Sequence, residues 1–394
     1  MLNFINKRDN IIIFFCAVII CANPINWILK IDNGLAIITL VLFSFIVILG
    51  RQQIIHNVNP KIFFLIFYIL FFFVISLLQT NFHPQTVSYL LQFAILGILP
   101  LLISQIYLQY DRIYVIILFL GILFIPFAFN FNIENYYSQF ESDIWGFIMG
   151  VSYGLLRFIV AGFIVLLLYT PKNLFLKIII LLETIAIISF LALYGTRGAI
   201  LSSLLLLILL LLLRKHTYLN RKALITFFSI LLTSIILWML FSSYVYPIIQ
   251  NKGVSFIFID KILSLKEEGD VSNGRIEIAQ YTLKHIVKKP FIGHGIGSFD
   301  NYSGAYPHNL FLHFLYEGGV FLCIPFIGLI SKSIYIMLSK QYEFNYRIYV
   351  IFLFFSSVIE LLFSSQPWIS QIFWLYIGSV LIAGQFKLRT EYIC

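Results

Sequence analysis

Two arginines in this sequence lie where a purely lipid-compatible chain would not keep them. Arg197 stands in "LYGTRGAI", a very short connection between two apolar runs, and Arg275 stands in "VSNGRIEIAQ", where a helix is predicted to begin. A guanidinium group presents a rigid fork of donors that suits phosphate oxygens. The two residues therefore predict an anion site. The alternatives are a snorkelling or carbonyl-capping arginine at 197 and an ordinary exposed loop arginine at 275.

A histidine follows in "YPHNLFLHFLYEGG", residues 306–319. His308 and Asn309 open the next apolar run, and a histidine titrates near neutral pH, so His308 could accept a proton from a hydroxyl group. A helix cap or a head-group contact is the alternative. His313 and Glu317 lie one helical turn apart on one face. Two ligands are too few for a metal site, and we expect a structural hydrogen-bonded pair.

The same polar region contains a run of glycines, "FIGHGIGSF". Gly293, Gly295 and Gly297 permit tight turns and a close approach of the backbone to a ligand. As a dinucleotide-binding fingerprint the run is a poor match, because no strand precedes it.

Two ionisable residues, Arg157 and Glu183, fall well inside consecutive apolar runs. Charged groups at the middle of a membrane are costly and are usually paired. We therefore expect these two side chains to meet, either as a structural pair or as part of a site.

The elements that must position all these residues are transmembrane helices. Of the 394 residues, 61% are hydrophobic and 11% are charged, against roughly 25% charged in soluble domains. The apolar runs approach the length needed to cross hydrocarbon, and an alternating barrel pattern does not occur. The sequence predicts an all-α, polytopic integral membrane protein with about twelve transmembrane helices, near residues 10–29, 34–50, 61–79, 86–108, 113–131, 145–170, 174–194, 198–213, 223–243, 308–338, 346–364 and 367–386.

The basic residues predict the orientation of these helices. With the N-terminus in the cytoplasm, every connection on the inner side carries Lys or Arg, whereas those near 81–85, 132–144 and 365–367 carry none. This distribution follows the positive-inside rule, and it places both termini in the cytoplasm. The net charge of +9 then reflects topology and attraction to lipid head groups, and it does not indicate nucleic-acid binding.

One long polar insertion, residues 244–307, faces away from the cytoplasm in this topology. It separates nine predicted spans in residues 1–243 from three in residues 308–394. Within it, the spacing of Ile276, Leu283 and Ile286 predicts a short amphipathic helix on the membrane face. Chemistry on that face has no ATP supply, so a bond made there needs an activated donor.

Three motifs in this order, "GTRGA", "GRIEIAQYTLKHIVKKPFIGHGIGSF" and "PHNLFLHFLYEGGVF", resemble the signature region of the O-antigen ligase and polymerase superfamily of bacterial membrane glycosyltransferases. The resemblance covers the C-terminal half as motif and the whole chain as topology. It implies a multi-pass protein of the bacterial inner membrane that transfers a glycan from undecaprenyl pyrophosphate on the periplasmic face, with no metal, cofactor or nucleotide sugar. One departure is Ala279, where the family often has a bulky aromatic residue.

The resemblance also implies roles for individual residues. By analogy Arg197 and Arg275 hold the pyrophosphate, and His308 orients or deprotonates the acceptor hydroxyl. Tyrosines 302, 306 and 316 offer ring faces and hydroxyls for sugars. Arg197, Arg275 and His308 are therefore the expected catalytic residues. Further residues are expected to bind the substrate: Arg157, Asn309, Gly295, Gly297, Tyr306 and Glu317.

The acceptor decides between two reactions. A polymerase transfers the glycan to another lipid-linked repeat unit, and a ligase transfers it to lipid A core. The short spacing from "GIGSF" to "PHN" favours the polymerase, which would work with a flippase and a chain-length regulator. The alternative of another class is a transporter or flippase for a lipid-linked solute, for which Arg157 and Glu183 would be pathway charges.

Overall fold

The computed structural model describes residues 7–22, 34–57, 59–106, 110–129, 144–194, 196–213, 274–301 and 306–388. This part of the chain is helical, apart from turns and one isolated bridge between Tyr342 and Lys387. The expected span 223–243, Tyr302 and the first part of the polar insertion, residues 244–273, lie outside the described residues.

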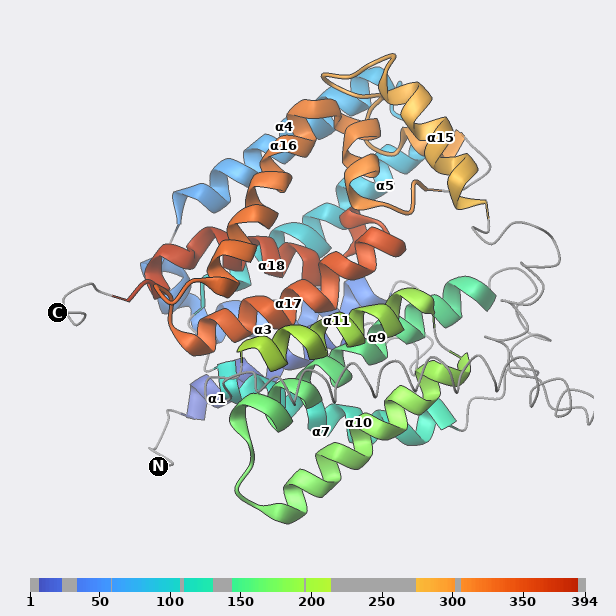
Figure 1. The fold of residues 1–394 in the computed structure, drawn as a ribbon. Helices are drawn as coiled ribbons and strands as arrows, with labels where there is room; N and C mark the ends of the chain where they lie inside the picture. Colours follow the sequence, from blue (N-terminus) through green and yellow to red (C-terminus); the bar gives the residue numbers. More distant parts are fainter. Residues whose placement is uncertain are drawn as a thin grey trace, which may run out of the picture.

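The helices follow the predicted spans closely (Figure 1). Seven helical segments among the described residues are long and apolar enough to cross a membrane, and three apolar helices are shorter, so the chain is a polytopic membrane protein. The elements are α1 (Lys7–Ile20), α3 (Gly34–His56), α4 (Pro60–Gln79), α5 (Pro84–Gln92) with η1 (Phe93–Ile98) and α6 (Leu99–Ile103), α7 (Tyr110–Phe129), α9 (Ile144–Ile164) with η2 (Val165–Tyr169), α10 (Leu174–Tyr194), α11 (Arg197–Leu213), α15 (Arg275–Ile286), η4 (Ser298–Asn301), α16 (Leu310–Leu338), α17 (Phe344–Phe363), η5 (Pro367–Ile369), α18 (Gln371–Leu381) and η6 (Ile382–Phe386).

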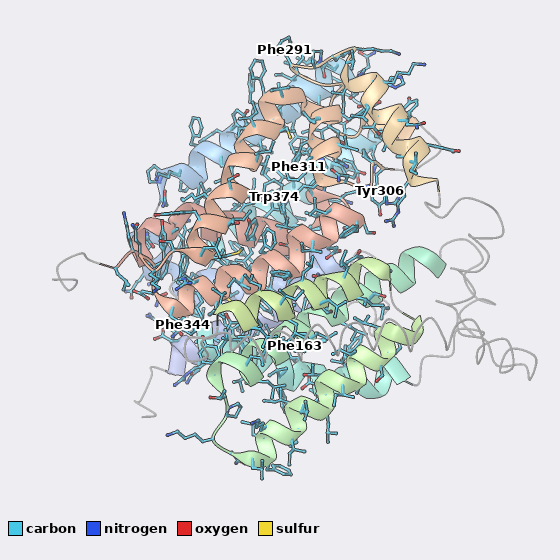
Figure 2. All side chains as sticks on the ribbon, in the orientation of Figure 1. Phe163, Phe291, Tyr306, Phe311, Phe344 and Trp374 are labelled. Carbon is cyan, nitrogen blue, oxygen red and sulfur yellow. The ribbon has the colours of Figure 1, made fainter. Side chains whose placement is uncertain are left out.

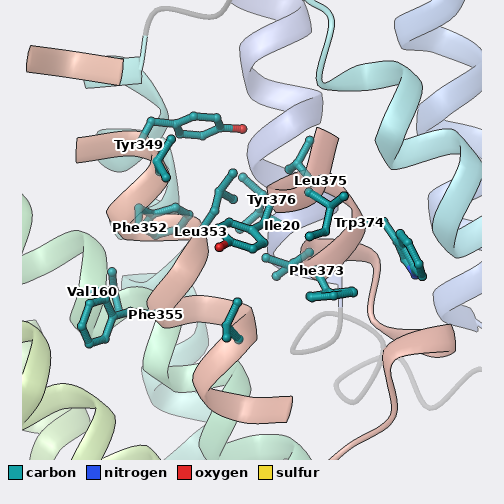
Figure 3. Packing of buried hydrophobic residues seen from close by; sticks show 14 of the residues in the cluster. Ile20, Val160, Tyr349, Phe352, Leu353, Phe355, Phe373, Trp374, Leu375 and Tyr376 are labelled. Carbon is teal, nitrogen blue, oxygen red and sulfur yellow. The ribbon is translucent and has the colours of Figure 1, made fainter. Parts of the chain in front are cut away.

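Two helices, α9 and α17, form the centre of the bundle. Helix α17 packs against α9, α11, α16 and α18. Figure 3 shows its side chains Phe352 and Phe355 beside Val160 of α9, and Tyr376 of α18 on its other side. Helix α4, by contrast, exposes a row of phenylalanines, including Phe64 and Phe67. In a membrane protein such a face meets lipid, because lipid tails are as apolar as the side chains.

Helix α16 is not a straight rod. Gly319 has φ 65° and ψ −163°, which breaks the helix into Leu310–Gly318 and Val320–Leu338. The rings of Phe314 and Phe326 stack with their centroids 4.3 Å apart, whereas twelve residues of continuous helix would separate them by about 18 Å. The two halves therefore fold back on each other as a helical hairpin. The structure thus divides the predicted span 308–338 at Gly319.

The glycine-rich loop satisfies the backbone groups that the break in α16 leaves free. The N–H groups of His294 and Gly295 donate to the carbonyls of Tyr316 and Glu317, both at 2.8 Å. In return, the N–H groups of residues 320 and 321 donate to the carbonyls of residues 290 and 291. Irregular backbone at membrane depth needs such partners inside the protein. The loop and the hairpin are therefore one structural unit.

A second irregularity in α16 is matched by a residue of α4. Pro325 has no N–H, so the carbonyl of Phe321 lacks its intrahelical donor. The hydroxyl of Tyr68 donates to that carbonyl instead.

We expect Tyr68→Phe to destabilise the protein by about 1 kcal/mol, because the Phe321 carbonyl then has no donor. In a Pro325→Ala background the helix supplies its own N–H, so the same change should have little effect. Thermal unfolding of the four proteins in detergent measures this cycle. Equal effects of Tyr68→Phe in the two backgrounds would contradict the assignment.

Candidate functional site

The predicted amphipathic helix exists as α15, and Arg275 is its first residue. Gly274 precedes it with φ 74°, a left-handed conformation that favours glycine. Exposed apolar residues such as Leu283 and Val287 lie on one side of α15. Its other side packs on the hairpin of α16. Arg275 is thereby held beside the start of that hairpin, where His308 lies.

His308 is half-buried, and its Nδ1 has no hydrogen-bond partner among the described residues. Its φ of 51° places it in the left-handed region. The pKa of His308 is lowered to about 4, mainly by burial, then by the positive charge of the neighbouring Arg275 and by His313. The imidazole is therefore neutral at pH 7, which is the protonation state a proton acceptor needs.

The start of α11 reaches the same region. The connection from α10 is as short as predicted, since α10 ends at Tyr194 and α11 begins at Arg197. A Cβ built on Gly198 would lie 2.1 Å from the hydroxyl oxygen of Tyr153, so α9 and α11 meet closely here. Tyr153 also interacts electrostatically with Arg275 and Tyr306. The structure thus brings together the backbone of Arg197, the side chain of Arg275 and the segment of His308; the side chain of Arg197 lies outside the described set.

Glu317 is committed to partners within the protein. Its Oε1 accepts from the N–H of Gly297 at 2.8 Å, and its Oε2 accepts from Nε1 of Trp368 at 2.7 Å. His313 Nε2 lies 3.0 Å from the same Oε2. The two side chains therefore meet, as expected, but the geometry at His313 Nε2 is not that of a hydrogen bond. These contacts hold the loop on the hairpin, and the direct substrate contact of Glu317 stays a prediction.

The loop glycines also face protein. A Cβ on Gly297 would lie 2.9 Å from the backbone nitrogen of Thr86, and one on Gly295 would lie 3.1 Å from the Thr80 methyl group. Both residues have positive φ, 102° at Gly295 and 80° at Gly297. Their lack of a side chain lets the loop pack on the α4–α5 turn, so a role in approaching phosphate has no support from this geometry.

Asn309 caps the hairpin. Its side-chain oxygen accepts from the N–H groups of Phe311 at 3.0 Å and Leu312 at 3.2 Å. Such a cap satisfies donors at the first turn of a helix. This bonding fixes the start of α16 immediately after His308, so Asn309 positions the histidine.

A family model described as O-antigen ligase covers part of the chain. Residues 182–327 match it. Members of this family are enzymes of the glycosyltransferase type, ligases and polymerases. The resemblance drawn from the motifs is therefore confirmed over this stretch. A search of the curated proteins and a search of the solved structures found no match.

The matched stretch 182–327 contains Arg197, Arg275, His308 and the whole turn of the hairpin. It ends before α17, which contains Glu360 and is followed by Ser364 and Ser365, the two residues that contact Tyr306 near His308. Sequence reasoning missed these residues. The signal for Glu360 was available, because "VIELLF" places a carboxylate inside an apolar run, where ionisable groups call for a partner.

The expected pair of Arg157 and Glu183 is wrong. Arg157, only 2% exposed, donates from Nη1 to the carbonyl of Ile20 at 2.8 Å, and its Nη2 lies 3.8 Å from Oε2 of Glu360. Neither carboxylate oxygen of Glu183 has a hydrogen-bond partner among the described residues. Arg157 thus caps α1 and pairs with a residue far along the chain. It lies outside the matched stretch 182–327, and its contacts join α9 to α1 and α17.

Within the described ranges, groups of three or more His, Cys, Asp and Glu side chains that could hold a metal ion do not occur. The candidate site residues can bind an anion and accept a proton. Arg275 offers a guanidinium to an anion, and His308 offers a neutral nitrogen to a hydroxyl proton.

The low pKa of His308 predicts its reactivity. Diethyl pyrocarbonate modifies neutral imidazole, so the modification rate of His308 should stay constant from pH 8 to about 5 and fall as the pH approaches 4, the pKa of this histidine. In Arg275→Ala the positive neighbour is lost, and the midpoint should move toward that of an ordinary histidine. Peptide mass spectrometry measures each histidine separately. An unmoved midpoint in Arg275→Ala would show that the guanidinium does not act on His308.

Proposed function

We propose that the protein is a glycan polymerase of the bacterial inner membrane, working on its periplasmic face. An acceptor sugar hydroxyl of one lipid-linked repeat unit attacks the anomeric carbon of a second glycan. The bond from that carbon to the pyrophosphate oxygen breaks, and undecaprenyl pyrophosphate leaves with the bonding electrons. His308 takes the hydroxyl proton, and Arg275 and Arg197 neutralise the charge that grows on the pyrophosphate.

The observation that carries this proposal is a neutral histidine beside an arginine. Arg275 lowers the pKa of His308 because two positive charges repel each other. A pyrophosphate bound at Arg275 would compensate the guanidinium charge, so the pKa of His308 would rise when the donor is present. The proton acceptor would thus become stronger in the complex that needs it.

Pyrophosphate is a good leaving group, so the protein has mainly to position two substrates and stabilise charge. The short spacing in the sequence from "GIGSF" to "PHN" favours a polymerase. The matching family model, described as O-antigen ligase, favours the second candidate, in which the acceptor is lipid A core.

Complementation of a strain that lacks this chain tests the proposal. Wild type, Arg275→Ala and His308→Ala are expressed at matched levels, and surface glycan is separated on a gel. Lys284→Ala is the control, because Lys284 is exposed on the same helix as Arg275.

A polymerase predicts that the deletion leaves a single repeat unit on lipid A core and that only wild type and Lys284→Ala restore the ladder. A ligase predicts that the core carries no glycan and that polymer accumulates on undecaprenyl pyrophosphate. Full rescue by Arg275→Ala and His308→Ala would overturn the catalytic assignment and favour a transporter.

A further inference from the structure

We infer that Tyr306, together with the turn formed by Ser364 and Ser365 after α17, positions His308 for proton transfer. The inference rests on the proposed role of His308. It changes the expected function of Tyr306 from a sugar contact to a positioning residue. Figure 2 labels Tyr306 between α15 and the neighbouring ends of α17 and α11.

The hydroxyl of Tyr306 is used within the protein. The backbone N–H of Ser365 donates to it at 2.9 Å, and the hydroxyl lies 3.1 Å from Oγ of Ser364. Because the N–H can only donate, the phenol oxygen accepts from residue 365 and its own proton is free to go to Ser364. The acceptor and the donor of the tyrosine therefore both have partners in the turn.

The ring of Tyr306 supports the imidazole. The two ring centroids lie 4.1 Å apart at an interplanar angle of 40°. His308 and Ser365 both have positive φ, 51° and 65°. Residues other than glycine adopt this conformation only when their surroundings impose it, and such residues cluster at functional sites. Tyr306 connects the two residues: its hydroxyl accepts from the backbone N–H of Ser365, and its ring lies tilted against the imidazole of His308.

The turn itself is anchored deep in the bundle. The N–H of Ser364 donates to the carbonyl of Glu360 at 2.7 Å, which ends α17. The carboxylate of Glu360 accepts a hydrogen bond from the Ser365 side chain and faces Arg157, which in turn bonds the end of α1. His308 is thus positioned through helices that lie outside the matched stretch 182–327.

The test measures turnover by purified full-length protein with lipid-linked repeat units extracted from the deletion strain. Tyr306→Phe keeps the ring and removes the hydroxyl. We expect kcat to fall about 10- to 100-fold, the scale of a small misplacement of a reacting group, with KM for the donor unchanged. Ser364→Ala should produce a smaller fall, because the N–H of Ser365 still holds the tyrosine. Tyr335→Phe is the control, since this exposed tyrosine donates to Gln341 and lies at the other end of α16.

A second readout separates positioning from loss of structure. In Tyr306→Phe the imidazole of His308 should be more mobile and more hydrated, so the midpoint of its diethyl pyrocarbonate modification should rise, while the extent of modification of His285 at pH 7 stays unchanged. Wild-type kcat in Tyr306→Phe, with His308→Ala inactive, would overturn this inference and leave the proposed function intact. Wild-type activity of His308→Ala would overturn both. A fall in activity with equal changes at His308 and His285 would indicate a general structural defect and would also contradict the inference.

Discussion

Replacing Arg275 with alanine is expected to lower the rate of glycan transfer about 100- to 1,000-fold, the usual effect of removing one preorganised donor for developing charge. The side chain starts α15 beside the neutral His308, where a pyrophosphate would gain its electrostatic partner. Arg275→Lys should retain part of the activity, because lysine keeps the charge but loses the planar fork of donors.

The rate is measured with purified protein and extracted lipid-linked repeat units. Lys284→Ala serves as the matched control, because it removes an exposed positive charge from the same helix. Loss of activity in Lys284→Ala to the same degree would mean that net charge near the membrane, and not the position of Arg275, supports turnover. Wild-type turnover of Arg275→Ala would exclude its catalytic role.

The second large effect concerns stability. Gly319→Ala is expected to destabilise the protein by about 3 kcal/mol or more. This figure adds the free-energy cost of holding alanine in a left-handed conformation to the cost of a steric overlap. The φ of Gly319 is 65°, and a Cβ there would lie 2.3 Å from both the carbonyl carbon and the oxygen of Phe291. Those atoms belong to the backbone that bonds the hairpin, so they cannot move away without breaking hydrogen bonds.

Gly328→Ala is the matched control for this prediction. It lies in the same helix, and a Cβ there would meet no atom within 4 Å. This change should be neutral or stabilise by about 0.5–1 kcal/mol, since alanine is the better helix former. The temperature at which the detergent-solubilised protein aggregates ranks wild type and both variants. A Gly319→Ala protein as stable as Gly328→Ala would refute the hairpin.

The transmembrane helices could be predicted from the sequence because the signal is local. Each span is a continuous apolar run, and the lipid leaves helical hydrogen bonding as the one local solution for its backbone. The start of α15 and the pair of His313 and Glu317 were predictable for the same reason, since residues one turn apart share a helix face. The recognition of the family also rested on short motifs, which are local as well.

Contacts between distant helices were not predictable in this way. Arg157 needed a buried carboxylate, and both Glu183 and Glu360 met that description. The sequence offers no measure of which helix lies opposite, so the nearer residue was chosen. The structure pairs Arg157 with Glu360, 3.8 Å away in space. The reversal of α16 was likewise hidden, because a glycine inside an apolar run is compatible with a straight span.

Sequence alone thus determined the membrane class, the helices, the family resemblance and the residue types that can do chemistry, because hydrophobicity and helix periodicity act between neighbours in the chain. Only the tertiary structure decided which of these residues share a site. It assigned Glu317 and the loop glycines to the hairpin and Arg157 to Glu360, and it placed Tyr306 between His308 and a turn in another helix. The physical reason is that these interactions depend on how whole helices pack, and packing joins residues that the sequence keeps far apart.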